Sequence, residues 1–524
     1  MKKFNVTGIC VPNMHYMVDT SNKLNKIIKL VNDGSYFTIN RARQFGKSTT
    51  LHLLEKALVN EYICTRLSFE GVGGVMFENE SIFCQRFLML ISDALSRTDK
   101  SYAKLWLDEN VTDIGLLSRH INSLCEHKKI ILMIDEVDAI SSNKVFLRFL
   151  GMLRTNFLDR PTGYANTFHS VILAGVYDIK TIKLKLIHEG AIERPGQEER
   201  SYNSPWNIAT EFNIEMHFNP DEIATMLADY EADYKTGMDI PAVAQEIYHF
   251  TSGYPVLVSK ICRCIAEELD LQDWSVAGVQ AAVKIITSRK SVLFDDIFKN
   301  LGNDKRIHDF LYDMLIVGNK RRRSIYDPDV EWCTMFGYIG TDAMGYTTIS
   351  NKIFEIVLLD YFSSKDSDTA KIEQMVSTGL YHEIVKSGSF DMALCMRKFA
   401  EHYHEIYTAE DVTFLERHGR LVFLSFLKPL VNGNGFFHIE SQFTDLRRMD
   451  VVVDYGQEQF VIELKLWKGE IAQDKAYKQL LGYMKSKNLD KGYLLTFDLR
   501  KEWNKSPKAQ WVQVDGKQIF EVIV

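Results

Sequence analysis

Short β-forming runs in the first part of the chain are separated by longer stretches with helical spacing. The runs lie at residues 34–39 (GSYFTI), 130–134 (IILMI) and 170–175 (SVILAG). The run at 130–134 is uninterrupted, which is typical of a strand buried on both faces. A helical pattern begins near Gly46, so strands and helices alternate. This alternation predicts a parallel sheet between layers of helices, which is an α/β fold.

The middle of the chain is mainly helical in its pattern. Residues 219–234 and 279–290 have the apolar spacing of amphipathic helices. Within residues 306–362, two helices and a short helix accompany a hairpin at 336–350 (FGYIGTDAMGYTTIS), which reads as strand, Gly-containing turn, strand. Residues 363–374 are polar and rich in Ser and Asp, which indicates a linker.

Residues 450–465 (DVVVDYGQEQFVIELK) alternate between apolar and other residues on both sides of a turn at Gly456-Gln457. This pattern predicts an antiparallel hairpin in which directly paired residues share a face. One face is wholly apolar, with the pairs Met449–Leu464, Val451–Ile462 and Val453–Phe460. A slip of one residue would scramble both faces, so the alternation specifies the register.

The other face of this hairpin brings charged residues together. Asp450 faces Glu463 with Cβ atoms about 5 Å apart, and Lys465 lies two residues further on that side. A hard divalent cation between the carboxylates removes their repulsion, and Mg²⁺ favours such oxygen ligands. Lys465 is then placed to orient a water or to stabilise developing phosphorane charge. The alternative is that Asp450 and Lys465 form surface ion pairs on a half-solvated sheet.

A second candidate site lies at residues 41–50 (RARQFGKSTT), between the first strand and its helix. The N–H groups of a helix N-terminus point at an anion there, and Lys47 can neutralise the outer phosphates of a nucleotide. Ser48 offers its hydroxyl to Mg²⁺. Arg41 stands where such loops usually have a leading glycine. A chance Gly-Lys-Ser sequence at a helix start is the alternative.

Two acidic residues follow the buried run at 130–134. Side chains at the carboxyl end of such a strand lie where ligands bind in open α/β sheets. Asp135 is placed to hold Mg²⁺ through water, and Glu136 to orient or deprotonate the attacking water. Two solvated acids at an ordinary strand end are the alternative. Tyr177 and Asp178 are candidates for sensing a γ-phosphate, with a plain strand end as the other interpretation.

Composition limits the location and the partners. The 524 residues are too many for one core, so we expect three or four domains. The net charge of −7 means that any nucleic-acid binding needs local patches. We find no secretory signal and no stretch near the roughly 18 apolar residues of a membrane span. The eight cysteines are scattered along the sequence. A reduced cytoplasm and no membrane partner are therefore expected.

The text VDTSNKLNKII…YFTINRARQFGKSTTL…SFEGVG resembles bacterial AAA-like ATPases, whose phosphate loop reads Asn-Arg-x-Arg-x-Phe/Tyr-Gly-Lys-Ser/Thr and also lacks the leading glycine. The resemblance continues through 204–212 (SPWNIATEF). It implies ATP and Mg²⁺ as cofactors. The implied nucleotide-binding residues are Arg43, Gly46, Lys47, Ser48, Thr49 and Asp135.

Residues 251–258 (TSGYPVLV) resemble the Gly-x-Pro segment of the STAND class of signal-transducing ATPases, in which a lid proline lies near the base. Pro255 is the matching residue, and a proline opening a helix is the alternative. Arg41 and Arg43 either contact phosphate or pair with acids elsewhere. The hairpin at 336–350 resembles the wing of a winged helix. The basic run KRRR at 320–323 either meets DNA phosphates or is a solvated loop, and we favour the loop.

Asp…Glu-x-Lys on a hairpin resembles the PD-(D/E)xK nuclease superfamily. The resemblance implies a metal site at Asp450 and Glu463, which takes Mg²⁺ or Mn²⁺, with Lys465 as the third core residue. Glu416 fits the helical glutamate that often completes this site, and a solvated helix acid is its alternative. Gln479 matches a glutamine on the following helix. Arg447 and Arg448 precede Asp450 and are placed to meet phosphate.

Both resemblances together imply an architecture for the whole chain. We expect a P-loop, parallel-sheet, AAA-like ATPase core, a helical lid, a winged-helix-like module, a linker, and a smaller α/β PD-(D/E)xK nuclease-like domain. In that order they cover 1–215, 216–298, 299–362, 363–375 and 376–524.

The leading hypothesis is an ATP-binding and ATP-hydrolysing switch coupled to a Mg²⁺-dependent nuclease that acts on DNA or RNA. The alternative is a nucleotide-switched binding or scaffold protein whose nuclease-like domain does not cleave. A helicase-like motor is disfavoured, since no second set of translocation motifs is present. Homo-oligomerisation, or a protein partner bound through the winged-helix module, stays open.

Overall fold

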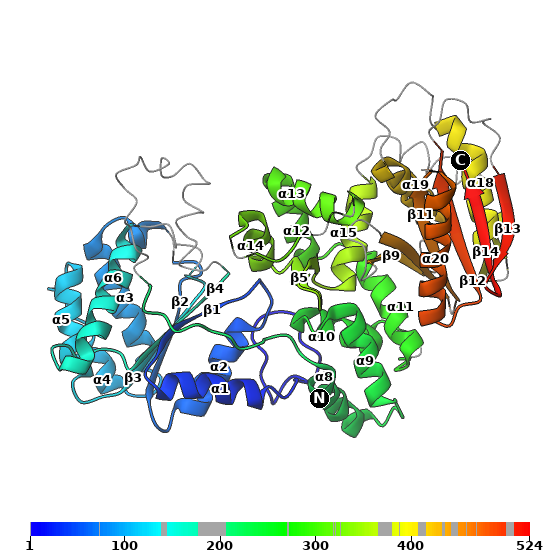
Figure 1. The fold of residues 1–524 in the computed structure, drawn as a ribbon. Helices are drawn as coiled ribbons and strands as arrows, with labels where there is room; N and C mark the ends of the chain where they lie inside the picture. The colour runs from blue at the N-terminus through cyan, green and yellow to red at the C-terminus, as the bar shows by residue number, and fades with distance from the viewer. Residues whose placement is uncertain are drawn as a thin grey trace, which may run out of the picture. The chain divides into compact units, whose positions relative to one another are not determined.

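In the computed structural model, whose helices and strands are labelled in Figure 1, the chain divides into two compact units. The first comprises Met1–Tyr248, Gly253–Arg263 and Met335–Gly337, and the second comprises His249–Ser252, Cys264–Thr334 and Tyr338–Val524. The described residues are 2–72, 74–137, 144–176, 206–269, 272–317, 319, 321–324, 326–364, 380–386, 388–406, 416–431, 435–441, 449–456, 458–467, 469–498 and 508–524. No helix within these ranges is long and apolar enough to cross a bilayer.

A parallel sheet forms the centre of the first unit. Its strands are β1 (Tyr36–Asn40), β2 (Ile63–Ser68), β3 (Ile130–Asp135) and β4 (Ser170–Gly175), in the order β1-β4-β3-β2. Every residue of β3 and β4 is buried, which confirms the predicted strands at these positions. A parallel bridge between Phe37 and Thr210 extends the sheet beyond β1.

Helices cover both faces of this sheet because its strands are apolar on both sides (Figure 1). On one face, Ile131 and Met133 pack with α1 (Ser21–Asn32) and α2 (Lys47–Leu58). On the other face, Leu132 and Ile134 pack with an aromatic cluster from α3 (Glu80–Leu95) and α6 (Lys144–Asp159). Further elements on that side are η1 (Gly74–Phe77), α4 (Lys100–Leu105), α5 (Ile114–Cys125) and η3 (Arg160–Thr162).

Helices follow the sheet along the chain, as the apolar spacing predicted. They are α8 (Pro220–Tyr234), α9 (Ile240–Thr251), α10 (Pro255–Glu267), α11 (Val276–Thr287) and α12 (Val292–Asn303). Asn219 and Glu222 form a capping box at the start of α8, in which each side chain accepts from the other residue's backbone N–H. The predicted helix at 219–234 is thus confirmed.

The middle of the second unit contains the predicted hairpin. Its elements are α13 (Lys305–Tyr312), the π-helical turn η4 (Asp313–Val317), α14 (Pro328–Met335), β5 (Ile339–Thr341), β6 (Thr347–Ile349) and α15 (Lys352–Ser364). β5 and β6 pair antiparallel, and Arg322 bridges to Tyr346 beside them. The winged-helix interpretation and the five-part domain division stay predictions. Lys320 and most of the predicted linker lie outside the described residues.

The C-terminal part is a mixed sheet with helices. Its sheet order is β13-β14-β12-β11-β10-β9. The strands are β9 (Gly435–Ser441), β10 (Met449–Tyr455), β11 (Glu458–Leu466), β12 (Lys491–Phe497), β13 (Lys508–Val514) and β14 (Lys517–Ile523). The other elements are α17 (Leu380–Ile384), β7 (Val385–Lys386), β8 (Ser389–Phe390), α18 (Met392–Ile406), α19 (Glu416–Val431) and α20 (Glu470–Ser486).

The register of β10 and β11 is the predicted one. Val451 pairs with Ile462, and Val453 pairs with Phe460. All four side chains are buried, so the apolar face lies in a core as expected. Gln457 of the predicted turn lies outside the described residues, while Gly456 has a φ of +60°.

Gly253 fixes the approach of α10 to the segment before α8. Its φ is +73°, and its carbonyl accepts a hydrogen bond of 2.9 Å from the N–H of Phe218. An added Cβ would lie 1.8 Å from the Phe218 carbonyl oxygen. Only glycine therefore fits between these two backbones.

We expect Gly253→Ala to lower the stability of the first unit by about 3 kcal/mol, because it combines a left-handed residue with a backbone clash. The urea midpoint of unfolding measures this loss. Gly163→Ala is the matched control, since Gly163 has a φ of +77° and open space around its Cβ position. A Gly253→Ala midpoint no lower than that of Gly163→Ala would contradict the proposed clash.

Candidate functional site

The loop between β1 and α2 makes its turn with two left-handed residues. Gln44 has a φ of +61°, and Gly46, which caps α2, has a φ of +76°. Glycine adopts this conformation without a steric penalty, so Gly46 suits the cap. The turn leaves the N-terminus of α2 at the carboxyl end of β1. Predicted residues Lys47, Ser48 and Thr49 are the first three residues of this helix.

The side chain of Lys47 closes the loop on itself. It is only 5% exposed. Its Nζ donates to the carbonyl oxygens of Arg41 at 2.9 Å and Ala42 at 3.0 Å. The ammonium group therefore lies inside the turn, which is the position from which it would meet an anion at the helix N-terminus.

Arg41 ties the loop to a distant segment. Its guanidinium donates to the carbonyl oxygens of Asn40 and Ile214, each at 2.8 Å. It also lies 5.5 Å from the ring centre of Phe212. Burial of the guanidinium lowers the pKa of Arg41 from its usual value. Arg43, by contrast, is exposed at the surface of the loop.

The carboxyl end of β3 carries the two predicted acids. Asp135 is 6% exposed, and its Oδ1 accepts the N–H of Glu136 at 3.0 Å. Glu136 has a φ of +56°, which is strained for a glutamate. Since β4 alone separates β3 from β1, these acids and the Lys47 loop lie about 10 Å apart along one sheet edge. Tyr177 and Asp178 lie outside the described residues.

Two segments from later in the chain pack against the loop. The hydroxyl of Tyr254 donates to the carbonyl of Arg43 at 2.7 Å, and its ring lies edge-on to Phe45 at 4.4 Å. Gly337 has a φ of +73°, and an added Cβ there would lie 2.9 Å from the Cβ of Ala42. Pro255 is buried and is the first residue of α10. Sequence reasoning chose Pro255 and missed the adjacent Tyr254.

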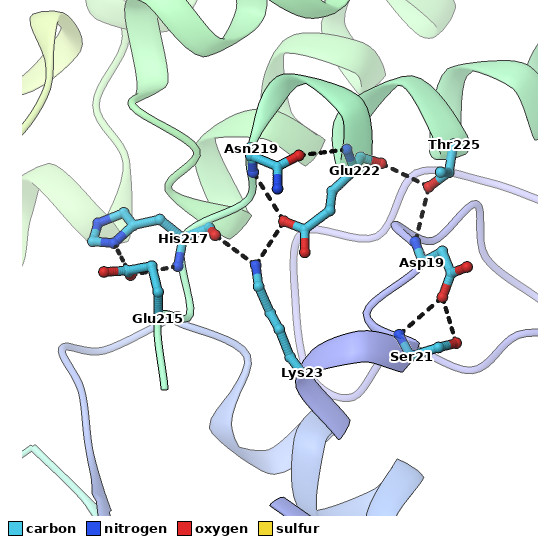
Figure 2. Close-up of polar contacts among 8 residues, drawn as sticks. All are labelled: Asp19, Ser21, Lys23, Glu215, His217, Asn219, Glu222 and Thr225. Atoms are coloured by element: carbon cyan, nitrogen blue, oxygen red, sulfur yellow. Dashed lines mark hydrogen bonds and ion pairs between the residues drawn. The ribbon is translucent and has the colours of Figure 1, made fainter. Parts of the chain in front are cut away.

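Polar contacts join the N-terminal segment to the start of α8 (Figure 2). Lys23 Nζ donates to the carbonyl of His217 and to Glu222 Oε2, both at 2.6 Å. The N–H of Asp19 donates to Thr225 Oγ1 at 2.9 Å. Nearer the loop, the N–H of Cys10 donates to Thr49 Oγ1 at 3.0 Å. The segment before β1 therefore links the phosphate loop to α8 within one unit.

The second candidate site lies on β11. Glu463 is 1% exposed, and Lys465 Nζ forms an ion pair with its Oε1. The register of β10 and β11, continued by one residue beyond Val451–Ile462, brings the backbone of Asp450 opposite Glu463. The side chains of Asp450 and Glu416 lie outside the description, as do Arg447 and Arg448. Glu416 is the first residue of α19.

Helix α20 covers the same face of the C-terminal sheet as Glu463. Gln479 lies half-buried on this helix. Gln473 is more buried, and its Nε2 donates to Thr496 Oγ1 at 3.4 Å and to Glu521. Tyr477 lies one turn later, and its burial together with the charge of Glu521 raises the pKa of its phenol. These polar residues were missed by sequence reasoning, although the i, i+4 spacing of Gln473 and Tyr477 signals a shared face.

Oxygen donors at both sites fit a hard cation. Asp135 and Ser48 supply a carboxylate and a hydroxyl at the sheet edge, and Glu463 supplies a nearly buried carboxylate. Within the described ranges, no group of three or more His, Cys, Asp or Glu side chains is arranged to hold a metal ion.

Two family models match this chain. The family model for the AAA-like domain matches residues 11–274, and that for the PD-(D/E)XK nuclease superfamily matches residues 436–506. Among solved structures, the chain is similar to Cdc6p from Pyrobaculum aerophilum, at 12% identity and a TM-score of 0.32, covering 69% of this chain and 97% of that one. No curated protein matches the chain.

A second similar structure is the ORC2 protein of Aeropyrum pernix in its ADPNP-ADP complexes. It is 12% identical with a TM-score of 0.35, and the match covers 69% of this chain and 98% of that one.

Glu215 gives the first unit an acid-sensitive contact beside the loop (Figure 2). Its Oε1 accepts the N–H of His217 at 2.9 Å and lies 2.6 Å from His217 Nδ1. The hydrogen bond with the His217 side chain, aided by charges including Arg41, lowers the pKa of Glu215 from 4.5 to about 2. The stabilisation is therefore present above pH 4.5 and is lost as the pH falls towards 2.

We expect Glu215→Gln to destabilise the protein by about 1 kcal/mol at pH 7, a value reduced for the solvent exposure of this side chain. The difference in urea midpoint between wild type and variant should shrink as the pH is lowered from 5 to 3. Glu211→Gln, which changes a neighbouring acid, serves as the control. A difference independent of pH would contradict the assignment.

Proposed function

Because this chain belongs to the AAA-like domain family, we propose that it is an ATP-binding and ATP-hydrolysing switch coupled to a metal-dependent nuclease. The observation that carries the proposal is the shared sheet edge. The Lys47 loop follows β1, and Asp135-Glu136 lie at the end of β3 in the same parallel sheet. Phosphate-binding groups and carboxylates in that arrangement serve phosphoryl transfer. The nuclease part rests on the match at residues 436–506 and on the buried Glu463–Lys465 pair.

For the nucleotide step, each predicted residue has a role. Gly46 shapes the turn, the backbone of Lys47, Ser48 and Thr49 faces the phosphates, and the ammonium of Lys47 binds the outer ones. Ser48 and Asp135 would hold Mg²⁺, which supplies charge neutralisation between phosphates.

Three further residues belong to the proposed nucleotide site. Glu136 orients the attacking water, and its strained backbone, with a φ of +56°, favours a functional role at this position. Arg43 is exposed on the loop, and its guanidinium can approach a phosphate. Pro255 opens the helix that follows Tyr254 and would border the base.

For the cleavage step, Asp450 and Glu463 would hold Mg²⁺ or Mn²⁺, which supplies Lewis-acid assistance when bound. A water attacks the phosphorus of a DNA or RNA strand, and a P–O bond of the backbone breaks. Lys465 orients this water or stabilises the negative charge that develops on the phosphoryl oxygens. Glu416 and Gln479 complete the proposed set of residues around the site.

The switch would reach the nuclease-like domain through packed elements of the second unit. Gly337, which touches Ala42 of the phosphate loop, directly precedes the β5–β6 module. Arg420 of α19 is buried and donates to the carbonyl of Ile316 in η4, and Lys428 pairs with Asp360 of α15 at 2.9 Å. A shift of these elements would therefore move α19, the helix that begins at Glu416.

We expect Lys47→Met to weaken ATP binding about 10- to 100-fold, because a charge-assisted hydrogen bond to phosphate contributes roughly 1.5–3 kcal/mol. Isothermal titration with ATP and Mg²⁺ measures the change. Lys56→Met is the matched control, since Lys56 lies exposed on the same helix and should bind ATP like the wild type. Unaltered ATP affinity of Lys47→Met would exclude this loop as the nucleotide site.

We expect Mn²⁺ to raise the melting temperature of the wild type and to have no such effect on Asp450→Asn, because one of the two carboxylates is lost. Mg²⁺-dependent cleavage of DNA or RNA should fall at least about 100-fold in the same variant. Asp454→Asn, four residues along the same strand, is the control. A metal shift that survives Asp450→Asn would leave a nucleotide-switched scaffold protein as the better description.

A further inference from the structure

A row of paired residues crosses the C-terminal sheet. Glu463 of β11 pairs with Leu494 of β12, Leu494 pairs with Glu521 of β14, and Glu521 pairs with Gln510 of β13. Residues paired directly across strands project from the same face. Glu521 therefore shares the face of Glu463, two strand positions or about 10 Å away. It lies outside the segment that matches the nuclease family model.

Glu521 is a buried carboxylate with two amide donors. It is 6% exposed. Gln473 Nε2 donates to its Oε1, and Gln510 Nε2 donates to its Oε2 at 3.3 Å. A buried charge is costly unless it is well hydrogen-bonded, so this acid is kept in the sheet by donors that converge from β13 and α20.

The carboxylate fixes which way the amide of Gln473 points. An ionised carboxylate only accepts hydrogen bonds, so the NH₂ group of Gln473 must face Glu521. Thr496 Oγ1 lies within reach of both ends of this amide, at 3.4 Å from Nε2 and 3.5 Å from the carbonyl oxygen Oε1. Thr496 is the β12 partner of Lys465. The acceptor oxygen of Gln473 is thereby presented beside the strand position that carries the lysine.

Tyr477 lies one helical turn from Gln473 on α20. Burial and the nearby negative charge of Glu521 together raise the pKa of its phenol. The phenol therefore stays protonated at neutral pH and adds no second negative charge beside Glu521.

We propose that Glu521 is a positioning residue of the nuclease-like site, which holds Gln473 so that its Oε1 accepts a hydrogen bond from the water beside Lys465. Partners of this kind orient the groups that contact the reactants and are needed for full activity. The water's role rests on the proposed function. The orientation of the Gln473 amide rests only on the hydrogen bonds described, and it can be tested without any cleavage assay.

The first experiment observes the amide directly in the full chain. Glutamine side chains are labelled with ¹⁵N, and the Gln473 NH₂ signal is identified by its loss in Gln473→Leu. In the wild type we expect two separated proton shifts with slow solvent exchange, because one N–H is bound to a buried carboxylate. In Glu521→Leu this separation should collapse and exchange should accelerate at least tenfold. In Glu521→Gln, an isosteric acceptor should retain most of the separation.

Glu355→Gln is the matched control, because Glu355 is a buried acid of the same unit that pairs with Lys352 on α15. It should leave the Gln473 signal unchanged. A Gln473 signal in Glu521→Leu identical to that of the wild type would overturn the proposal. A signal altered equally by Glu355→Gln would also overturn it, since the change would then reflect general loosening of the fold.

The second experiment links the network to cleavage. If the wild type cleaves nucleic acid, Glu521→Leu should lower kcat about 10- to 100-fold with KM within twofold, and Glu521→Gln should recover most of the rate. Equal kcat in Glu521→Leu and wild type would overturn the positioning role. If the wild type does not cleave, the proposed function fails, and the amide signal alone decides whether Glu521 orients Gln473.

Discussion

One buried ammonium group holds the phosphate loop in its closed form. Lys47 Nζ donates hydrogen bonds to the carbonyl oxygens of Arg41 and Ala42, and these bonds stabilise the turn made by Gln44 and Gly46. An anion at the helix N-terminus would compete for those donors, and the exchange favours the anion because donor and acceptor are then both charged. The loop carbonyls would then be released, and one of them belongs to the residue that touches Gly337. Ligand arrival and loop shape are thus linked through a single side chain.

Features set by local periodicity were predictable from the sequence. The β3 strand follows from five consecutive apolar residues, and the β10–β11 register follows from alternation that tolerates no slip. The helix at 219–234 follows from its spacing and its cap. In each case the deciding residues lie within a few positions of one another, so the local pattern contains the information.

Features that depend on distant partners were not predictable. The sequence left open whether Arg41 contacts phosphate or makes structural contacts. One of its acceptors, the carbonyl oxygen of Ile214, lies 173 residues away along the chain. Tyr254 contributes to the site through its hydrogen bond to the Arg43 carbonyl. Because this acceptor is a backbone group, the residue types along the sequence do not reveal the contact. Glu521 interrupts the apolar run at 519–523 in β14, and only the order of the folded sheet shows that it shares a face with Glu463.

The position of β14 within its sheet limits how the chain can be divided. β14 lies between β13 and β12 and pairs with both along its whole length, although it comes after the residues that match the nuclease superfamily. A recombinant fragment trimmed at residue 506 would strip β12 of its neighbour and leave a row of bare amide groups on an apolar strand. An unpaired strand edge pairs with other chains, so the shortened fragment would aggregate and could not be used to measure catalysis.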